Sequence, residues 1–122
     1  MSTTNSKLTR VADNIRILSA AMVEKAKAKF GKLDILVNNA GINIPCLLVD
    51  PKDPYGKYEL SERVYDKVTN VNIRGVYLMA QALGHEFVKN GKGVIINMSS
   101  ESGLEGSEGQ SIYAATKNAV NS

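Results

Sequence analysis

Tyr113 and Lys117 are the residues of this sequence whose types and spacing most clearly suggest chemistry. They lie four residues apart in helix-forming sequence, a spacing that places both side chains on one face, one turn apart. Because a nearby cation stabilises a phenolate, Lys117 is expected to help Tyr113 release its proton. Ser100, thirteen residues before the tyrosine, adds a hydroxyl that could hold a carbonyl or alcohol oxygen during that transfer. Together these side chains predict the interconversion of an alcohol and a ketone.

The segments around this pair decide between catalysis and a plain surface pair on a helix, because a bare Tyr-x-x-x-Lys pattern fits both. Residues 38–41 read Asn-Asn-Ala-Gly and end an apolar run over 33–37. Asn72 follows, and a second apolar run over 94–98 leads to Ser100. The order of these segments before Tyr113 and Lys117 favours a catalytic site over a pair that occurs by chance on a helix surface.

The elements that must position these residues alternate between helices and strands. Both apolar runs have the continuous character of strands buried on both faces, as in a parallel sheet. Helix–strand–helix–strand–helix order predicts an α/β protein, a partial doubly wound, Rossmann-like parallel sheet with helical cover. The expected order is an irregular lead-in over 1–13, a helix from about Asp13 to Lys29, a strand over 33–37, a long loop over 42–60, a helix capped by Ser61 and running to about Lys89, a strand over 94–98, a mobile loop over 101–110 and a last helix from about Ser111.

Composition describes an ordinary globular chain, with 43% hydrophobic and 22% charged residues and no tryptophan. At 122 residues we expect a single domain with a modest core. No apolar run is long enough to span a membrane, and the polar first residues are not typical of a signal peptide. The one cysteine, Cys46, suits a reducing cytoplasm, which is the expected location. The net charge of +3 comes without a basic stripe for nucleic acid, and no side-chain spacing suggests a metal site.

These segments, in this order and spacing, resemble the short-chain dehydrogenase/reductase family over about residues 30–122. The resemblance implies an NAD(P)-dependent oxidoreductase, with 1–122 as a single partial NAD(P)-binding Rossmann-like domain. The family's glycine-rich turn, which holds the cofactor pyrophosphate after an opening strand, has no counterpart among the ten glycines. The sequence therefore resembles the central part of such an enzyme, without that N-terminal turn and without the C-terminal part.

Four residues match the catalytic positions of this family. By resemblance, Tyr113 transfers the proton, Ser100 holds the substrate oxygen, and Lys117 both assists Tyr113 and holds the nicotinamide ribose. Asn72 is implied to anchor a water that relays protons to Lys117. The alternatives are an exposed helix lysine at Lys117, and a local kink or a satisfied polar contact at Asn72.

The Asn-Asn-Ala-Gly turn is expected at the carboxyl end of its strand, where ligands bind in such sheets. Asn39, Ala40 and Gly41 are therefore candidates for the cofactor site, since small residues let the backbone approach a ribose. The alternative is a turn in which Gly41 only permits the geometry. Asn38 is expected to be structural, with its amide joining neighbouring strands.

A finer resemblance concerns the substrate. The insertion over 42–60 and the stretch 98–111 are similar to family members that interconvert sorbitol 6-phosphate and fructose 6-phosphate with NAD. The resemblance implies a small-molecule sugar-phosphate substrate, NAD as the cofactor with NADP left open, and a homo-oligomer in the complete enzyme. Neither a nucleic-acid nor a membrane partner is expected.

Two hypotheses for this chain remain. In the first, it is part of an active sugar-phosphate dehydrogenase. In the second, it is a truncated, non-catalytic relative that acts, if at all, by association with a partner, because an edge of the 33–37 strand would carry unpaired backbone groups. The isolated 122-residue chain is expected to bind NAD poorly, to turn over little or nothing, and to self-associate or be partly molten.

Overall fold

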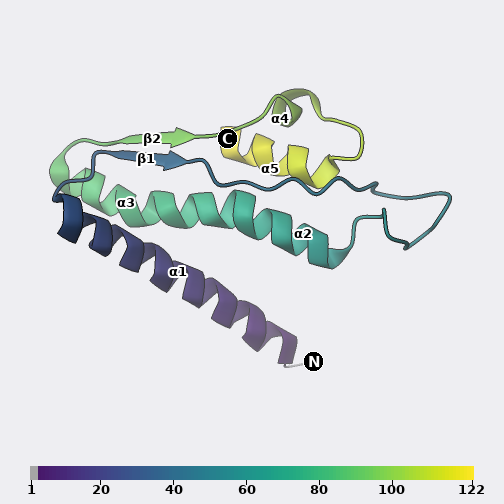
Figure 1. Ribbon diagram of the computed structural model, residues 1–122, viewed down its shortest axis with the longest axis horizontal. Coiled ribbons are helices and arrows are strands. Elements are labelled where there is room, and N and C mark those ends of the chain that lie inside the picture. The colour runs from purple at the N-terminus through teal and green to yellow at the C-terminus, as the bar shows by residue number, and fades with distance from the viewer. Residues whose placement is uncertain (1–2) are drawn as a thin grey trace. The chain divides into compact units, whose positions relative to one another are not determined.

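The computed structural model describes the backbone of residues 3–122, together with the side chains of Asn14 and of residues 16–122 (Figure 1). Helices and strands alternate along the chain, and α2, η1 and α3 follow one another without a break. In order, the elements are α1 (Thr3–Phe30), β1 (Ile35–Asn38), α2 (Glu62–Thr69), the π-helix η1 (Asn70–Gly75), α3 (Val76–Asn90), β2 (Val94–Asn97), α4 (Ser102–Glu105) and α5 (Ser111–Asn121).

Strands β1 and β2 form a two-stranded parallel sheet, and their arrows run side by side in Figure 1. The N–H of Val94 donates to the carbonyl oxygen of Asp34 at 2.9 Å. Four residues further along both strands, the N–H of Met98 donates to the carbonyl oxygen of Asn38 at 3.1 Å, which fixes a parallel register without a bulge. Asn38 Nδ2 also donates to Asn97 Oδ1 at 2.9 Å, so the structural amide expected between neighbouring strands is confirmed.

The described chain divides into two compact units. The first comprises the chain up to Leu36 together with Tyr77–Ile96. Its core joins α1, β1 and α3 through four buried side chains, which are Val23, Leu36, Leu83 and Phe87. Half-buried apolar side chains pack against this cluster, namely Leu33, Met79, Ala80 and Ala82. Apolar burial of this kind is the main stabilising term for such a unit.

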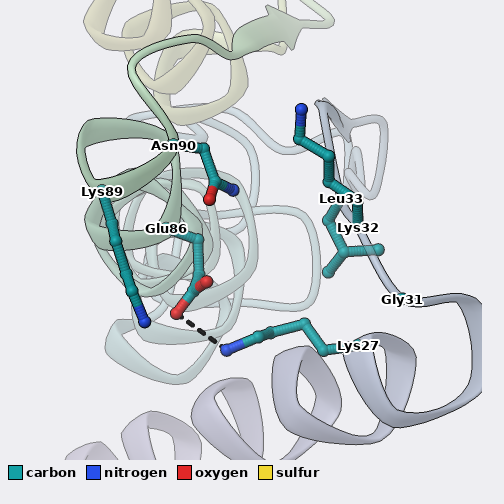
Figure 2. Close-up of a pocket in the computed structure, with 7 residues that line it drawn as sticks. All are labelled: Lys27, Gly31, Lys32, Leu33, Glu86, Lys89 and Asn90. Atoms are coloured by element: carbon teal, nitrogen blue, oxygen red, sulfur yellow. Dashed lines mark ion pairs between the residues drawn. The ribbon is translucent and has the colours of Figure 1, made fainter.

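An ion pair ties the end of α1 to α3 within the first unit. Lys27 Nζ lies 2.8 Å from a carboxylate oxygen of Glu86, as the dashed line in Figure 2 marks. The same Nζ lies 3.2 Å from a carboxylate oxygen of Glu24. The hydrogen bond between Lys27 and Glu86 raises the pKa of the lysine and lowers the pKa of the glutamate. The pair lies in a pocket of about 250 Å³ that is also lined by Gly31, Lys32, Leu33, Lys89 and Asn90. None of the predicted site residues lines this pocket.

The second unit comprises Val37–Val76 and Asn97–Ser122, and it holds all of the predicted site residues. Its interior is partly polar, since Val68, Asn72 and Thr116 are each at most 1% exposed. Helix α4 packs directly on α5 at Gly103, because a Cβ on this glycine would lie 2.9 Å from the carbonyl carbon of Lys117. The absence of a side chain at Gly103 lets the two helices approach closely.

Helix α1 begins about ten residues before the expected start near Asp13. The lead-in predicted as irregular is therefore helical over residues 3–13, while residues 1–2 lie outside the described part. The sequence carries the reason, because Leu8 and Val11 continue the helical spacing of apolar residues upstream of Ile15 without an intervening Gly or Pro. The assignment of 1–122 to a single domain stays a prediction.

Helix α2 begins where the sequence predicts. Ser61 Oγ accepts a hydrogen bond from the N–H of Val64 at 3.3 Å, so Ser61 is the N-cap. The helix predicted to reach about Lys89 continues through η1 and α3 to Asn90. The π-helical geometry of η1 is a difference from the expected regular helix, and Asn72 lies within it.

The strands are less buried than predicted. β1 alternates, with Leu36 and Asn38 buried but Ile35 and Val37 exposed, and all four residues of β2 are exposed. Burial on both faces is therefore wrong for the described residues, because their core cluster takes in Leu36 of β1 and no residue of β2. The predicted loop over 101–110 is also not wholly irregular, since it contains α4 with Gly103 buried.

Candidate active site

The side chain of Lys117 is buried on α5, with 6% of the residue exposed. Its Nζ donates a hydrogen bond of 2.6 Å to the carbonyl oxygen of Met98, just after β2. The hydroxyl of Ser99 donates to the carbonyl oxygen of Lys117 at 3.2 Å. The interpretation of Lys117 as an exposed helix lysine is therefore wrong, because both ends of the residue are held against the segment that follows β2.

Tyr113 lies one turn before Lys117 on the same helix, as the spacing of four predicts. Lys117 Nζ lies 5.8 Å from the centroid of the Tyr113 ring, within the range of a cation–π contact. Tyr113 is half-buried. The structure therefore places the ammonium of Lys117 and the ring of Tyr113 beside each other on one helix.

Asn72 holds the turn after β1 through its side-chain amide. Its Oδ1 accepts from the N–H of Ile42 at 2.9 Å, and its Nδ2 donates to the carbonyl oxygen of Ile42 at 2.9 Å. The second Nδ2 proton goes to Thr116 Oγ1 at 3.0 Å. The polar atoms of the Asn72 side chain therefore all have hydrogen-bond partners, and the residue lies in the π-helical segment η1. Both observations agree with the structural alternative for Asn72, a local kink or a satisfied polar contact. The role of Asn72 in proton relay stays a prediction.

Gly41 lies beside both Lys117 and Asn72. A Cβ on Gly41 would be 3.2 Å from Lys117 Nζ and 3.6 Å from Asn72 Oδ1. Any larger residue would therefore crowd the lysine ammonium. The preceding residues, Asn39 and Ala40, are exposed at the carboxyl end of β1. The structure thus brings Gly41, Asn72 and Lys117 together, with Asn39 and Ala40 adjacent in the chain.

Ser100 lies where the chain leaves β2 and turns into α4. It is half-buried, and its carbonyl oxygen accepts a hydrogen bond from the N–H of Gly103 at 3.0 Å. Gly103 in turn packs on the backbone of Lys117. The turn that carries the Ser100 hydroxyl is therefore attached to the helix that carries Tyr113 and Lys117.

Thr116 is a residue of this site that sequence reasoning missed. It is fully buried, its Oγ1 donates to the carbonyl oxygen of Tyr113 at 2.7 Å, and it accepts from Asn72 Nδ2. Gly103 was missed in the same way. In the sequence Thr116 is a small residue beside Lys117 and Gly103 is a glycine three residues after Ser100, and both patterns are too common to be informative.

Other kinds of chemistry find less support in the described part of the chain. No group of three or more His, Cys, Asp or Glu side chains there could hold a metal ion. No helix in that part is long and apolar enough to cross a membrane. Burial raises the pKa of the Cys46 thiol, which disfavours the nucleophilic thiolate.

A parallel sheet with polar residues gathered beyond the carboxyl ends of its strands places the chain among Rossmann-like α/β proteins. Solved structures agree with this class. The structure of ElxO with NADP bound has a TM-score of 0.75 and 34% sequence identity, covering 86% of this chain and 39% of that one. A gluconate 5-dehydrogenase from Burkholderia cenocepacia J2315, in complex with NADP and tartrate, has a TM-score of 0.72 and 33% identity, covering 84% and 36%.

The family model for short chain dehydrogenases matches residues 11–122. The chain therefore belongs to the short-chain dehydrogenase family of NAD(P)-dependent oxidoreductases, which confirms the family predicted from the motifs.

The chain is also similar in sequence to enzymes named for particular substrates. Sorbitol-6-phosphate 2-dehydrogenase of Klebsiella pneumoniae is 58% identical over 94 residues, which are 77% of this chain and 35% of the relative. 2-Dehydro-3-deoxy-D-gluconate 5-dehydrogenase of Dickeya dadantii (strain 3937) is 44% identical over 102 residues, which are 83% and 37%. This chain thus spans little more than a third of the length of these relatives.

Proposed function

We propose that the protein containing this chain interconverts a secondary alcohol and a ketone on a sugar phosphate, namely sorbitol 6-phosphate and fructose 6-phosphate, with NAD as cofactor. The substrate rests on the 58% identity to the Klebsiella pneumoniae enzyme named for sorbitol 6-phosphate. Some other relatives are named for different substrates, among them a 3-oxoacyl-[acyl-carrier-protein] reductase of Thermotoga maritima, so the substrate is tested separately from the reaction type.

The observation that carries the proposal is the buried Lys117 ammonium, held 5.8 Å from the ring of Tyr113 on one face of α5. In the oxidative direction, the Tyr113 phenolate takes the proton of the C2 hydroxyl of the substrate. The hydroxyl of Ser100 holds the oxygen of the developing carbonyl. Lys117 stabilises the phenolate, and Asn72 contributes by fixing the turn around Ile42 beside Gly41.

The residues present fit a nicotinamide nucleotide. Gly41 leaves space beside the Lys117 ammonium, because a Cβ at this position would lie 3.2 Å from Lys117 Nζ. The bond from Lys117 to Met98 uses one of three ammonium protons, so Lys117 would hold a ribose hydroxyl with those that remain. Asn39 and Ala40 are exposed and can border the same ribose. A nicotinamide nucleotide, when bound, accepts the hydride released from the substrate carbon.

The test compares Tyr113→Phe with the natural protein that contains this sequence, purified from cells that express its gene. Reduction of fructose 6-phosphate is followed by the absorbance of NADH. Removing the phenolic hydroxyl is expected to lower kcat by about 10²- to 10⁴-fold, the usual contribution of a general acid–base group. The matched control is Tyr65→Phe, which removes the same hydroxyl from an exposed residue on α2 and should leave kcat unchanged.

The substrate and the cofactor are tested separately from the mechanism. Fructose without phosphate and a 3-oxoacyl substrate are assayed beside fructose 6-phosphate, each with NADH and with NADPH. A higher kcat/KM for one of the other substrates would refute the sugar-phosphate assignment, while loss of activity in Tyr113→Phe would still support the reaction type. Full activity of Tyr113→Phe would refute the role of the Tyr113 phenol. A natural protein that reduces none of these ketones with NADH or NADPH would refute the reaction type itself.

A further inference from the structure

Thr116 connects two parts of the site that the sequence keeps apart. Its side chain lies between Asn72 of η1 and the backbone of Tyr113 on α5, and it is fully buried. A threonine hydroxyl has one proton to donate. Because that proton goes to the carbonyl oxygen of Tyr113 at 2.7 Å, Oγ1 must act as acceptor towards Asn72 Nδ2 at 3.0 Å. The direction of both hydrogen bonds is thereby fixed.

The same reasoning fixes the Asn72 amide. Its Oδ1 faces the Ile42 N–H, so its two Nδ2 protons are given to Ile42 O and to Thr116 Oγ1. A continuous chain of hydrogen bonds therefore runs from the turn next to Gly41, through Asn72 and Thr116, to the backbone carbonyl of Tyr113. Bonds in such buried chains polarise and support one another.

We propose that Thr116 is a positioning residue for proton transfer. Its hydroxyl sets the position of α5 against the turn at Ile42, and so sets where the Tyr113 phenol stands relative to the cofactor side of the site at Gly41. The inference rests on the proposed function, since it needs Tyr113 to be the group that transfers the proton. Thr116 itself touches no reacting atom.

The experiment compares Thr116→Val with Thr116→Ser in the natural protein, using the reductase assay. Valine keeps the shape of the side chain but removes the hydroxyl, whereas serine keeps the hydroxyl and removes a methyl group. We expect Thr116→Val to lower kcat by about 10- to 100-fold with KM nearly unchanged, as for a small misplacement of a reacting group. Thr116→Ser should keep kcat within about threefold of the natural protein, because the hydrogen-bond chain is intact.

A double-mutant cycle separates positioning from general damage. If Thr116 acts through the phenol of Tyr113, then adding Thr116→Val to Tyr113→Phe should lower kcat less than about twofold further. Equal losses in both backgrounds would overturn the proposal, as would equal impairment of the valine and serine variants. If Thr116→Val does not fold, Thr116→Ala removes the same hydroxyl with a smaller side chain and is judged by the same criteria.

These outcomes are distinct from a failure of the proposed function. Natural activity in Tyr113→Phe would refute the role of the phenol, and the positioning proposal with it. A strong loss in Tyr113→Phe together with full activity in Thr116→Val would refute the positioning proposal alone.

Discussion

Replacing Gly103 with alanine should separate α4 from α5 at the point where the site lysine is held. A Cβ at this position would lie 2.9 Å from both the carbonyl carbon and the Cβ of Lys117, and 3.0 Å from the backbone nitrogen of Asn118. Real Cβ atoms do not approach other heavy atoms so closely, and backbone atoms cannot turn away as the end of a side chain can. The helices must therefore shift. Inserting a methyl group into such a packed contact costs about 1–3 kcal/mol.

Gly84→Ala is the matched control for this substitution. Gly84 lies within α3, and a Cβ there meets no heavy atom within 4 Å. Alanine is favoured over glycine in a helix by about 1 kcal/mol, so Gly84→Ala should stabilise the protein by roughly that amount. Gly103→Ala receives at most the same gain from its short helix. The two variants should therefore differ in free energy of unfolding by about 1–4 kcal/mol, with Gly103→Ala the less stable.

Urea unfolding of the natural protein and the two variants measures this difference directly. Because Gly103 contacts the backbone of Lys117, the same substitution should also lower kcat in the reductase assay, while Gly84→Ala leaves kcat unchanged. Equal stability of the two variants would refute the claim that the contact between α4 and α5 is tight.

Three further outcomes are expected. Ser61→Ala should lower the free energy of unfolding by about 0.5–1 kcal/mol through loss of the N-cap, whereas Ser61→Thr keeps a capping oxygen; equal losses in both would contradict the cap. The hydrogen bond to Lys27 lowers the pKa of Glu86 below its ordinary value of 4.5. The ionised Glu86 carboxylate therefore stabilises the fold above pH 4.5, and this stabilisation is lost as the pH falls through the lowered pKa. The stability difference between the natural protein and Glu86→Gln should accordingly vanish in acid, and a difference that persists far below pH 4.5 would contradict the pairing. An isolated 122-residue polypeptide should self-associate through its exposed strands, as measured by sedimentation. Ile35 is 60% exposed on β1, so Ile35→Glu should reduce this association more than Tyr55→Ser in the long loop. Equal effects of the two variants would exclude β1 as the surface of association.

Much of the fold could be predicted because it depends on local patterns. The apolar runs marked β1 and β2, and Ser61 marked the start of α2. The extent of α1 was underestimated because polar residues in its first turns hid a helical spacing that starts at Leu8. Strand burial could not be predicted. An apolar run such as 94–98 is compatible with burial, but it carries no information about which residues of the chain pack against it, and the residues of β2 are exposed.

The candidate site divides in the same way. Sequence alone determined that Tyr113 and Lys117 share a helical face, and the order of motifs determined the family, because both depend only on spacing along the chain. Only the tertiary structure decided that Asn72 bonds Ile42, 30 residues away, and Thr116, 44 residues away. It likewise decided that Gly103 packs on Lys117. Contacts of this kind depend on how helices and turns meet in space, and helical or strand periodicity carries no information about that meeting.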